Sequence, residues 1–139
     1  MTAVSRDPGL ANDELINRDL IQKWLLWGFF WLMFAPTVGV FVSTKFNYPG
    51  FLGESAWSTF GRLRPVHVNG VIWGAFSTLF IGLAYYITPR LAGVPVWKES
   101  WGYPLLWIWN LNLAVAFVGL TAFGTNRGWE AGELAFPNV

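Results

Sequence analysis

Three stretches of about twenty residues each contain no Asp, Glu, Lys or Arg. They are residues 24–42, 66–88 and 102–123. Each is close to the roughly 20 residues that an α-helix needs to cross the hydrocarbon core of a bilayer. Backbone groups in lipid must find their hydrogen bonds within the spanning segment, so we expect each stretch to be a helix. The sequence therefore predicts an all-α integral membrane protein with three transmembrane helices.

The composition agrees with a chain surrounded by membrane lipid. Only 12% of the 139 residues are charged and 54% are hydrophobic, whereas soluble domains have about 25% charged residues. The net charge of +1 gives no reason to expect a nucleic-acid partner. The chain has no cysteine. It therefore has no disulfide, no thiolate metal ligand and no covalently attached c-type haem.

The chain divides into three regions by polarity. Residues 1–22 form a polar tail, in which Asn12 or Asp13 is expected to cap a short amphipathic helix. Residues 23–123 form the membrane region, and residues 124–139 form a second tail on the opposite side. Five Lys and Arg residues lie on the side of the N-terminal tail and four on the other. This small excess favours a cytoplasmic N-terminus in the inner (plasma) membrane, with His67 near the outer side.

His67, the only histidine, lies in the run GRLRPVHVNG at residues 61–70. Proline is well tolerated in the first turn of a helix, so we expect the second helix to begin near Pro65, with His67 in its first turn. Arg62 and Arg64 precede it, on the side where the charge bias disfavours cations. One explanation is an anionic partner held by both guanidinium groups. The other is two long side chains that extend to lipid phosphates.

Two glycines follow His67 on the same side of the predicted helix, at Gly70 and Gly74. Glycines four residues apart are typical of closely packed membrane helices. Alternatively, the imidazole ligates haem iron, the bare glycine face leaves room for the macrocycle, and Arg62 and Arg64 pair with the propionates. An ionisable residue inside a span is a functional candidate. The residues by themselves leave both interpretations open.

Other polar side chains give weaker signals. We expect the asparagines of the spans to hydrogen-bond across helices; they are Asn69, Asn110 and Asn112. Glu130 and Glu133, in the C-terminal tail, are either solvated charges or ligands of a bound cation.

Residues 60–72 read FGRLRPVHVNGVI. This run resembles the second-helix signature of subunit I of the cbb3-type cytochrome c oxidases, which has the form FGRLRPLHTNAVI. It is also similar to the large subunit of bacterial nitric oxide reductases. The resemblance continues at residues 84–90, AYYITPR, and more loosely in the tail at residues 124–137, GTNRGWEAGELAFP. It covers essentially all of residues 20–137.

The resemblance implies a three-helix part of a bundle of about twelve helices. It implies that His67 is an axial ligand of a low-spin haem b, with Gly70 and Gly74 against the haem and Arg62 and Arg64 at its propionates. It implies that Glu130 or Glu133 holds a calcium ion near a propionate. The whole subunit would pass electrons from c-type cytochrome subunits to a binuclear centre that reduces oxygen, coupled to proton translocation.

One histidine cannot complete such a subunit. The second axial ligand, the catalytic haem, and the copper or non-haem iron would all depend on residues outside this chain. We therefore expect an N-terminal piece of a longer subunit, or one chain of a split subunit. Two alternatives to an oxidase subunit stay open. In the first, the chain is part of a nitric oxide reductase large subunit. In the second, it is a non-catalytic membrane or assembly subunit that binds no haem.

Overall fold

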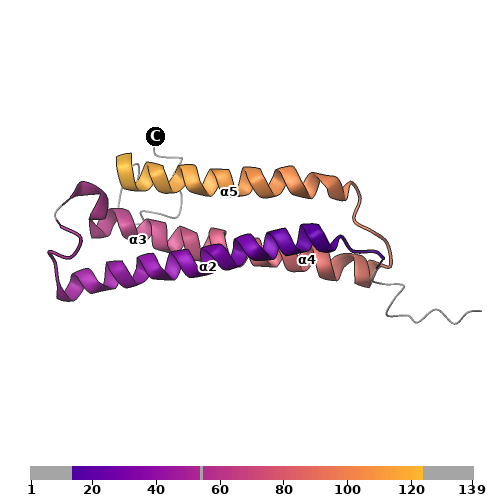
Figure 1. Ribbon diagram of the computed structural model, residues 1–139, viewed down its shortest axis with the longest axis horizontal. Coiled ribbons are helices and arrows are strands. Elements are labelled where there is room, and N and C mark those ends of the chain that lie inside the picture. The colour runs from indigo at the N-terminus through magenta and orange to yellow at the C-terminus, as the bar shows by residue number, and fades with distance from the viewer. Residues whose placement is uncertain (1–13, 54, 124–139) are drawn as a thin grey trace, which may run out of the picture.

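The computed structural model describes residues 14–53 and 55–123, and these form three long helical segments (Figure 1). The first is α2, Arg18–Asn47. The second is continuous and consists of α3 (Phe60–Asn69), the π-helix η2 (Gly70–Phe76) and α4 (Ser77–Ala92). The third consists of η3 (Glu99–Trp101), α5 (Gly102–Val118) and the π-helix η4 (Gly119–Phe123). The short 3-10 helix η1 (Ala56–Ser58) precedes α3. No strand occurs within the described ranges, which confirms the all-α prediction.

All three segments are long and apolar enough to cross a membrane. They contain 30, 33 and 25 residues, so each extends beyond the predicted limits of its span. At about 1.5 Å per residue, α2 is about 45 Å long, which exceeds the hydrocarbon core of about 30 Å. The described residues thus contain three helices that could each cross a membrane by length and composition, as the sequence predicted.

The first helix begins at a side-chain cap that the sequence reading did not identify. Asn17 Oδ1 accepts a hydrogen bond from the backbone N–H of Leu20 at 3.0 Å, which satisfies one of the free donors of the first turn. Leu20 and Ile21 lie in the first turn of α2. The predicted caps, Asn12 and Asp13, lie outside the described residues.

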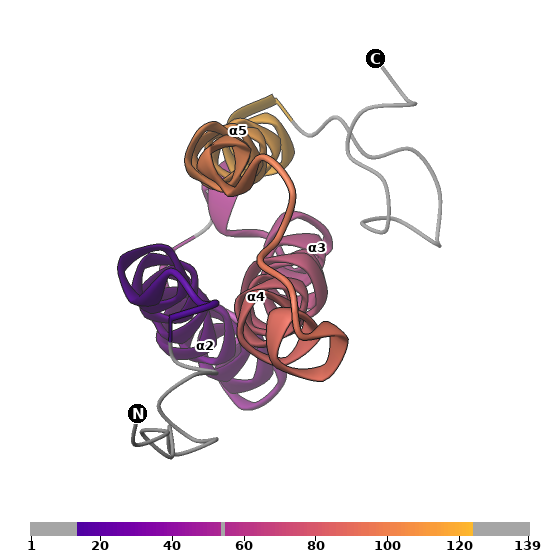
Figure 2. The same cartoon turned by 90° about the vertical axis from the view of Figure 1, so that its right-hand side faces the viewer.

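Viewed along the bundle, α2 lies beside α3 and α4, and α5 lies above them (Figure 2). The second segment runs antiparallel to α2, and α5 runs parallel to it (Figures 1 and 2). We call the two ends of the bundle the Arg18 end and the Asn47 end, after the first and last residues of α2. The Arg18 end therefore contains the start of α5, and the Asn47 end contains the start of α3.

Small residues bring α2 and the second segment into close contact. A Cβ atom added at Gly70 would lie 2.6 Å from the Cβ of Ala35, and one added at Gly74 would lie 2.8 Å from Cγ of Trp31. Both glycines are buried. The glycine face therefore packs against α2. The structure does not leave it open for a haem macrocycle, as one of the two interpretations of the sequence required. Helices in lipid associate through close packing, and glycine permits it.

Trp31 joins all three helices. It is 4% exposed, and its Nε1–H donates a hydrogen bond of 2.7 Å to Oδ1 of Asn110 on α5. Its ring also meets that of Phe117 edge-on, with centroids 5.1 Å apart. The predicted cross-helix bond of Asn110 is confirmed. Asn69 instead donates within its own helix, to the carbonyl of Pro65 at 2.9 Å.

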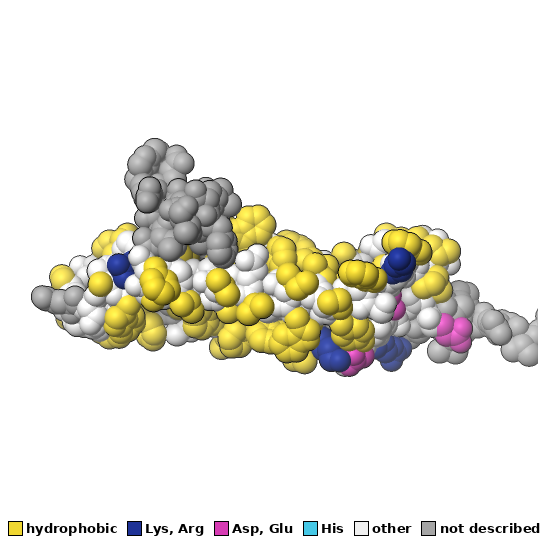
Figure 3. Space-filling model, turned by 90° about the horizontal axis from the view of Figure 1, so that it is seen from above, with side chains coloured by type: hydrophobic (Ala, Val, Ile, Leu, Met, Phe, Trp, Pro, Cys, Tyr) yellow, Lys and Arg dark blue, Asp and Glu magenta, His cyan; other side chains and the backbone are white. Residues whose placement is uncertain are grey.

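The surface of the bundle is largely apolar, and charged side chains gather mainly at the Arg18 end (Figure 3). Large exposed side chains include Leu26, Met33 and Phe80, which are 67%, 73% and 66% exposed. A surface of this kind suits contact with lipid or with other membrane helices.

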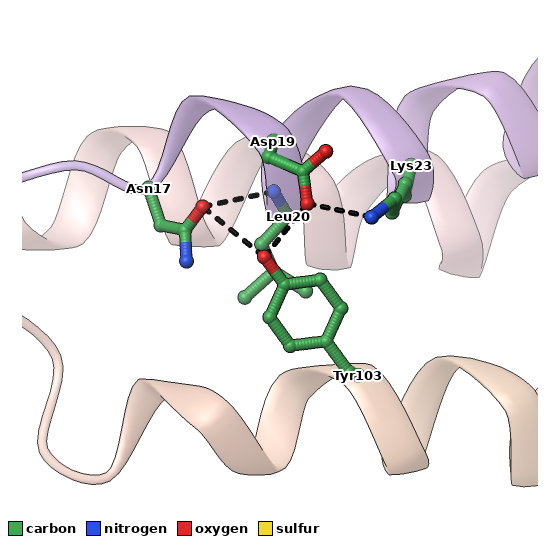
Figure 4. Close-up of polar contacts among 5 residues, drawn as sticks. All are labelled: Asn17, Asp19, Leu20, Lys23 and Tyr103. Atoms are coloured by element: carbon green, nitrogen blue, oxygen red, sulfur yellow. Dashed lines mark hydrogen bonds and ion pairs between the residues drawn. The ribbon is translucent and has the colours of Figure 1, made fainter.

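A polar cluster fixes α5 to α2 at the Arg18 end (Figure 4). The hydroxyl of Tyr103 donates a hydrogen bond of 2.8 Å to Oδ2 of Asp19. The same oxygen of Asp19 accepts from Nζ of Lys23 at 2.6 Å. Asp19 also suits the positive N-terminal end of the α2 dipole. This cluster fixes the position of α5 along the axis of α2. It does not contribute to the site around His67.

Candidate functional site

His67 lies deeper in its helix than the sequence predicted. The helix α3 begins at Phe60, where the carbonyl of Thr59 accepts from the N–H groups of Arg62 and Leu63 at 3.1 and 3.0 Å. Pro65 is therefore inside the helix and not at its start. With about 1.5 Å of rise per residue, His67 lies about 10 Å from the beginning of α3. The expectation of a histidine in the first turn is corrected by about one helical turn.

The imidazole of His67 contacts the backbone of α2. Its Nδ1 is 2.8 Å from the carbonyl oxygen of Ala35. His67 is half-buried, and its ring lies against Gly39, the residue one turn after Ala35 on α2. A histidine inside a span is thus held by a second helix as well as by its own.

The carbonyl of Ala35 determines which ring nitrogen carries the hydrogen. A carbonyl oxygen can only accept, so Nδ1 must be the donor, and in the neutral imidazole the lone pair then lies on Nε2. Within the described part of the chain, Nε2 has no hydrogen-bond partner. A ring held in this way can bind a metal through Nε2, and metal-binding histidines usually donate their other N–H to a carbonyl or carboxylate.

The two arginines lie on different sides of α3. They are two residues apart, which separates them by about 200° around the helix. Arg62 faces η4, where one of its guanidinium nitrogens donates to the carbonyls of Thr121 and Ala122 at 2.8 and 3.2 Å. A cation here complements the negative C-terminal end of the third segment. The structure therefore does not bring Arg62 and Arg64 together beside one group.

Arg64 is closer than Arg62 to His67 in angle around the axis of α3. The three residues between them correspond to about 60° around the helix, and the Arg64 side chain is exposed. Arg62 instead lines a cleft of about 660 Å³ between the helices, together with Phe117 and Val66, and His67 does not line it. Of the two arginines, Arg64 is thus the one on the side of the histidine.

The remaining predicted site residues do not add to this constellation. Gly70 and Gly74 pack against α2, as described above. Glu130 and Glu133 lie outside the described residues. Within residues 14–53 and 55–123, no group of three or more His, Cys, Asp or Glu side chains stands close enough to hold a metal ion.

Sequence reasoning missed Ala35 and Gly39. They are four residues apart in the first span, and this small-x-x-x-small spacing mirrors Gly70 and Gly74 in the second. Matching small residues on two spans are a signal of close helix contact. That signal could have indicated where the two helices meet, although not that His67 would lie at the crossing.

Comparison with known proteins assigns the chain to a family. Residues 19–137 match the family described as Cytochrome C and Quinol oxidase polypeptide I. The cbb3-type cytochrome c oxidase subunit CcoN1 of Stutzerimonas stutzeri is 25% identical over 127 residues, which are 91% of this chain and 27% of that protein. Cytochrome c oxidase subunit 1 of Rhodobacter capsulatus is 26% identical over 131 residues, which are 92% of this chain and 24% of that protein. The cytochrome c oxidase subunit 1 homolog of Azorhizobium caulinodans is 30% identical over 110 residues, which are 75% of this chain and 19% of that protein.

The chain spans about a quarter of the length of the first and second of these relatives. No solved structure gives a significant match. The family match includes α2, the whole second segment with His67, and the third segment. The family expected from residues 60–72 is confirmed, and the chain belongs to the cytochrome c and quinol oxidase polypeptide I family.

Proposed function

We propose that this chain is part of the catalytic subunit of a cbb3-like cytochrome c oxidase and that His67 is an axial ligand of a low-spin haem b. The observation that carries the proposal is the hydrogen bond between His67 Nδ1–H and the Ala35 carbonyl. It leaves Nε2 as the metal-binding nitrogen of a half-buried ring. Haem iron needs only axial donors from the protein, so one such nitrogen suits it.

The bound haem would supply one-electron transfer between ferric and ferrous iron. The residues of this chain have simpler tasks. His67 binds the iron, and the Ala35 carbonyl orients the ring and leaves Nε2 as the nitrogen that can ligate. Arg64 places a positive charge on the side of His67. Arg62 donates to a carbonyl of η4, so its task in the proposal is to hold η4 near α3.

The proposal assigns the other parts of the site to residues outside this chain. These are the second axial ligand, the catalytic haem with its copper, and the path for protons that are translocated as oxygen is reduced. The partners would be the other helices of subunit I, about nine in number, and c-type cytochrome subunits. The complex would lie in the plasma membrane, with a cytoplasmic N-terminus. Glu130 and Glu133 are proposed as calcium ligands, on the resemblance of the tail alone.

Metal analysis of the purified native complex tests the oxidase assignment. We expect low-spin haem b together with copper, measured by optical spectroscopy and by mass spectrometry of the metals. Haem with non-haem iron and no copper would instead indicate a nitric oxide reductase. A complex without haem would refute the proposal and favour a non-catalytic subunit.

Replacing Arg64 by glutamine in the complex is expected to lower the midpoint potential of the low-spin haem. A nearby cation favours the reduced, less positive iron, so its loss favours the oxidised form. At an effective dielectric constant of about 20, one unit charge contributes on the order of tens of millivolts. A redox titration followed at the haem absorption band measures the shift.

Arg62→Gln is the matched control for that titration. Its guanidinium bonds carbonyls at the end of the third segment, so we expect reduced thermal stability, by about 1 kcal/mol, and a smaller change in potential. If Arg62→Gln shifts the potential more than Arg64→Gln, the assignment of Arg64 to the haem side is wrong.

A further inference from the structure

Gly39 lies on α2 next to the ring of the proposed ligand. A Cβ atom added at this position would lie 2.6 Å from both Cε1 and Nδ1 of His67, and 3.2 Å from its Cγ. Real Cβ atoms essentially never approach other atoms to less than 3.0 Å. The space that a side chain would need at residue 39 is therefore already taken by the imidazole. Gly39 lies within a regular helix, so the close approach of the ring, and not an unusual backbone angle, requires glycine here.

The ring cannot give way without losing its bond to α2. Its Nδ1 is one of the two ring atoms nearest to the missing Cβ, and it is also the donor to the Ala35 carbonyl at 2.8 Å. Movement away from residue 39 would lengthen this hydrogen bond and release the restraint on the ring. Gly39 and the Ala35 carbonyl thus act together on the ring. Gly39 determines how closely the ring approaches α2, and the Ala35 carbonyl determines the rotation and the tautomer of the ring.

We propose that Gly39 is a positioning residue for the haem b ligand. This inference rests on the proposed function of His67 and adds a specific requirement on α2. Any side chain at residue 39 would displace the imidazole. Nε2 would then no longer point in the direction that the Nδ1–Ala35 hydrogen bond gives it. Supporting groups around a metal ligand commonly matter for affinity by 10-fold to 100-fold when they are altered.

The test is Gly39→Ala in the full complex, read by the low-spin haem signal in optical and electron paramagnetic resonance spectra per assembled complex. We expect a loss of most of the low-spin signal, or altered g-values in the part that remains. The matched control is Gly28→Ala, on the same helix. Its added Cβ would also lie 2.6 Å from the nearest atoms, but these belong to Leu79. We expect Gly28→Ala to keep the wild-type spectrum in whatever complex assembles.

A second comparison keeps the test decisive if Gly39→Ala reduces assembly. When His67 is alanine, the ring is gone, and Gly39→Ala has no imidazole to displace. We therefore expect Gly39→Ala to lower assembly or haem signal with His67 present and to have no further effect on assembly in the His67→Ala background. Such coupling is the signature of two residues in direct contact. An equal loss of assembly in both backgrounds, or a wild-type haem spectrum in Gly39→Ala, would overturn the positioning role.

The two proposals fail in different ways. If His67→Ala keeps the low-spin haem, the proposed function itself is wrong. If His67→Ala abolishes the low-spin haem but Gly39→Ala leaves its spectrum and assembly unchanged, only the role of Gly39 is wrong.

Discussion

A complex with His67→Ala is expected to lose its low-spin haem b signal almost completely. The reason is that the Nε2 lone pair, which the Ala35 carbonyl leaves available, is the only imidazole donor in this chain. Haem that is still present should be high-spin, because one axial position lacks its strong-field ligand. A reduced-minus-oxidised optical difference spectrum of purified complex measures the change. Oxygen consumption by the same preparation should fall to background.

Asn112→Ala provides the control for that substitution. Asn112 is also polar and lies in a span, but it is exposed on α5 and away from the α2–α3 contact. We expect its complex to keep the wild-type spectrum. A loss of low-spin haem in Asn112→Ala as severe as in His67→Ala would mean that the signal responds to general damage of the bundle.

Replacing Trp31 by alanine is expected to produce the largest loss of stability. The substitution removes a side chain that is 4% exposed and leaves a cavity between three helices. It also removes the donor to Asn110 Oδ1, a buried acceptor. Large-to-small changes of buried aromatic residues cost about 3–5 kcal/mol in soluble cores. We expect a loss of about 3 kcal/mol here, measured as a lower thermal transition of the detergent-solubilised complex.

Two variants separate the contributions of Trp31. Trp31→Phe keeps a ring but loses the N–H, so we expect a smaller cost of about 1–2 kcal/mol from the unsatisfied Asn110. Trp101→Ala, at a site that is 67% exposed, should change stability much less. If Trp31→Ala and Trp101→Ala lower the transition equally, Trp31 is not the residue that holds the three helices together.

The spans could be predicted from the sequence because they depend on local composition. An uncharged run of the right length in lipid has few alternatives to a helix. The ends were less predictable. Charge-based limits placed the start of the second span at residue 66, whereas α3 begins at Phe60. Arg62 and Arg64 lie inside α3, so the first charged residues before the apolar run did not mark the start of the helix.

The site was predicted in part, for a similar reason. The importance of His67 follows from its type and its place in a span. The separation of Arg62 and Arg64 around α3 could also have been derived, from 100° per residue. The contact of His67 with Ala35 and Gly39 could not be derived from the sequence, because it depends on how α2 is rotated and shifted against α3. The same rotation decides that Gly70 and Gly74 face Ala35 and Trp31 and not open space.

The most direct test of the central assignment is chemical rescue of His67→Gly. This substitution removes the imidazole and leaves a space beside Gly39 and the Ala35 carbonyl. If His67 ligates the haem, free imidazole added to the purified complex should enter that space and restore the low-spin spectrum, with a saturable dependence on concentration. A His67→Gly complex that shows the full low-spin haem b spectrum before any imidazole is added would contradict the assignment.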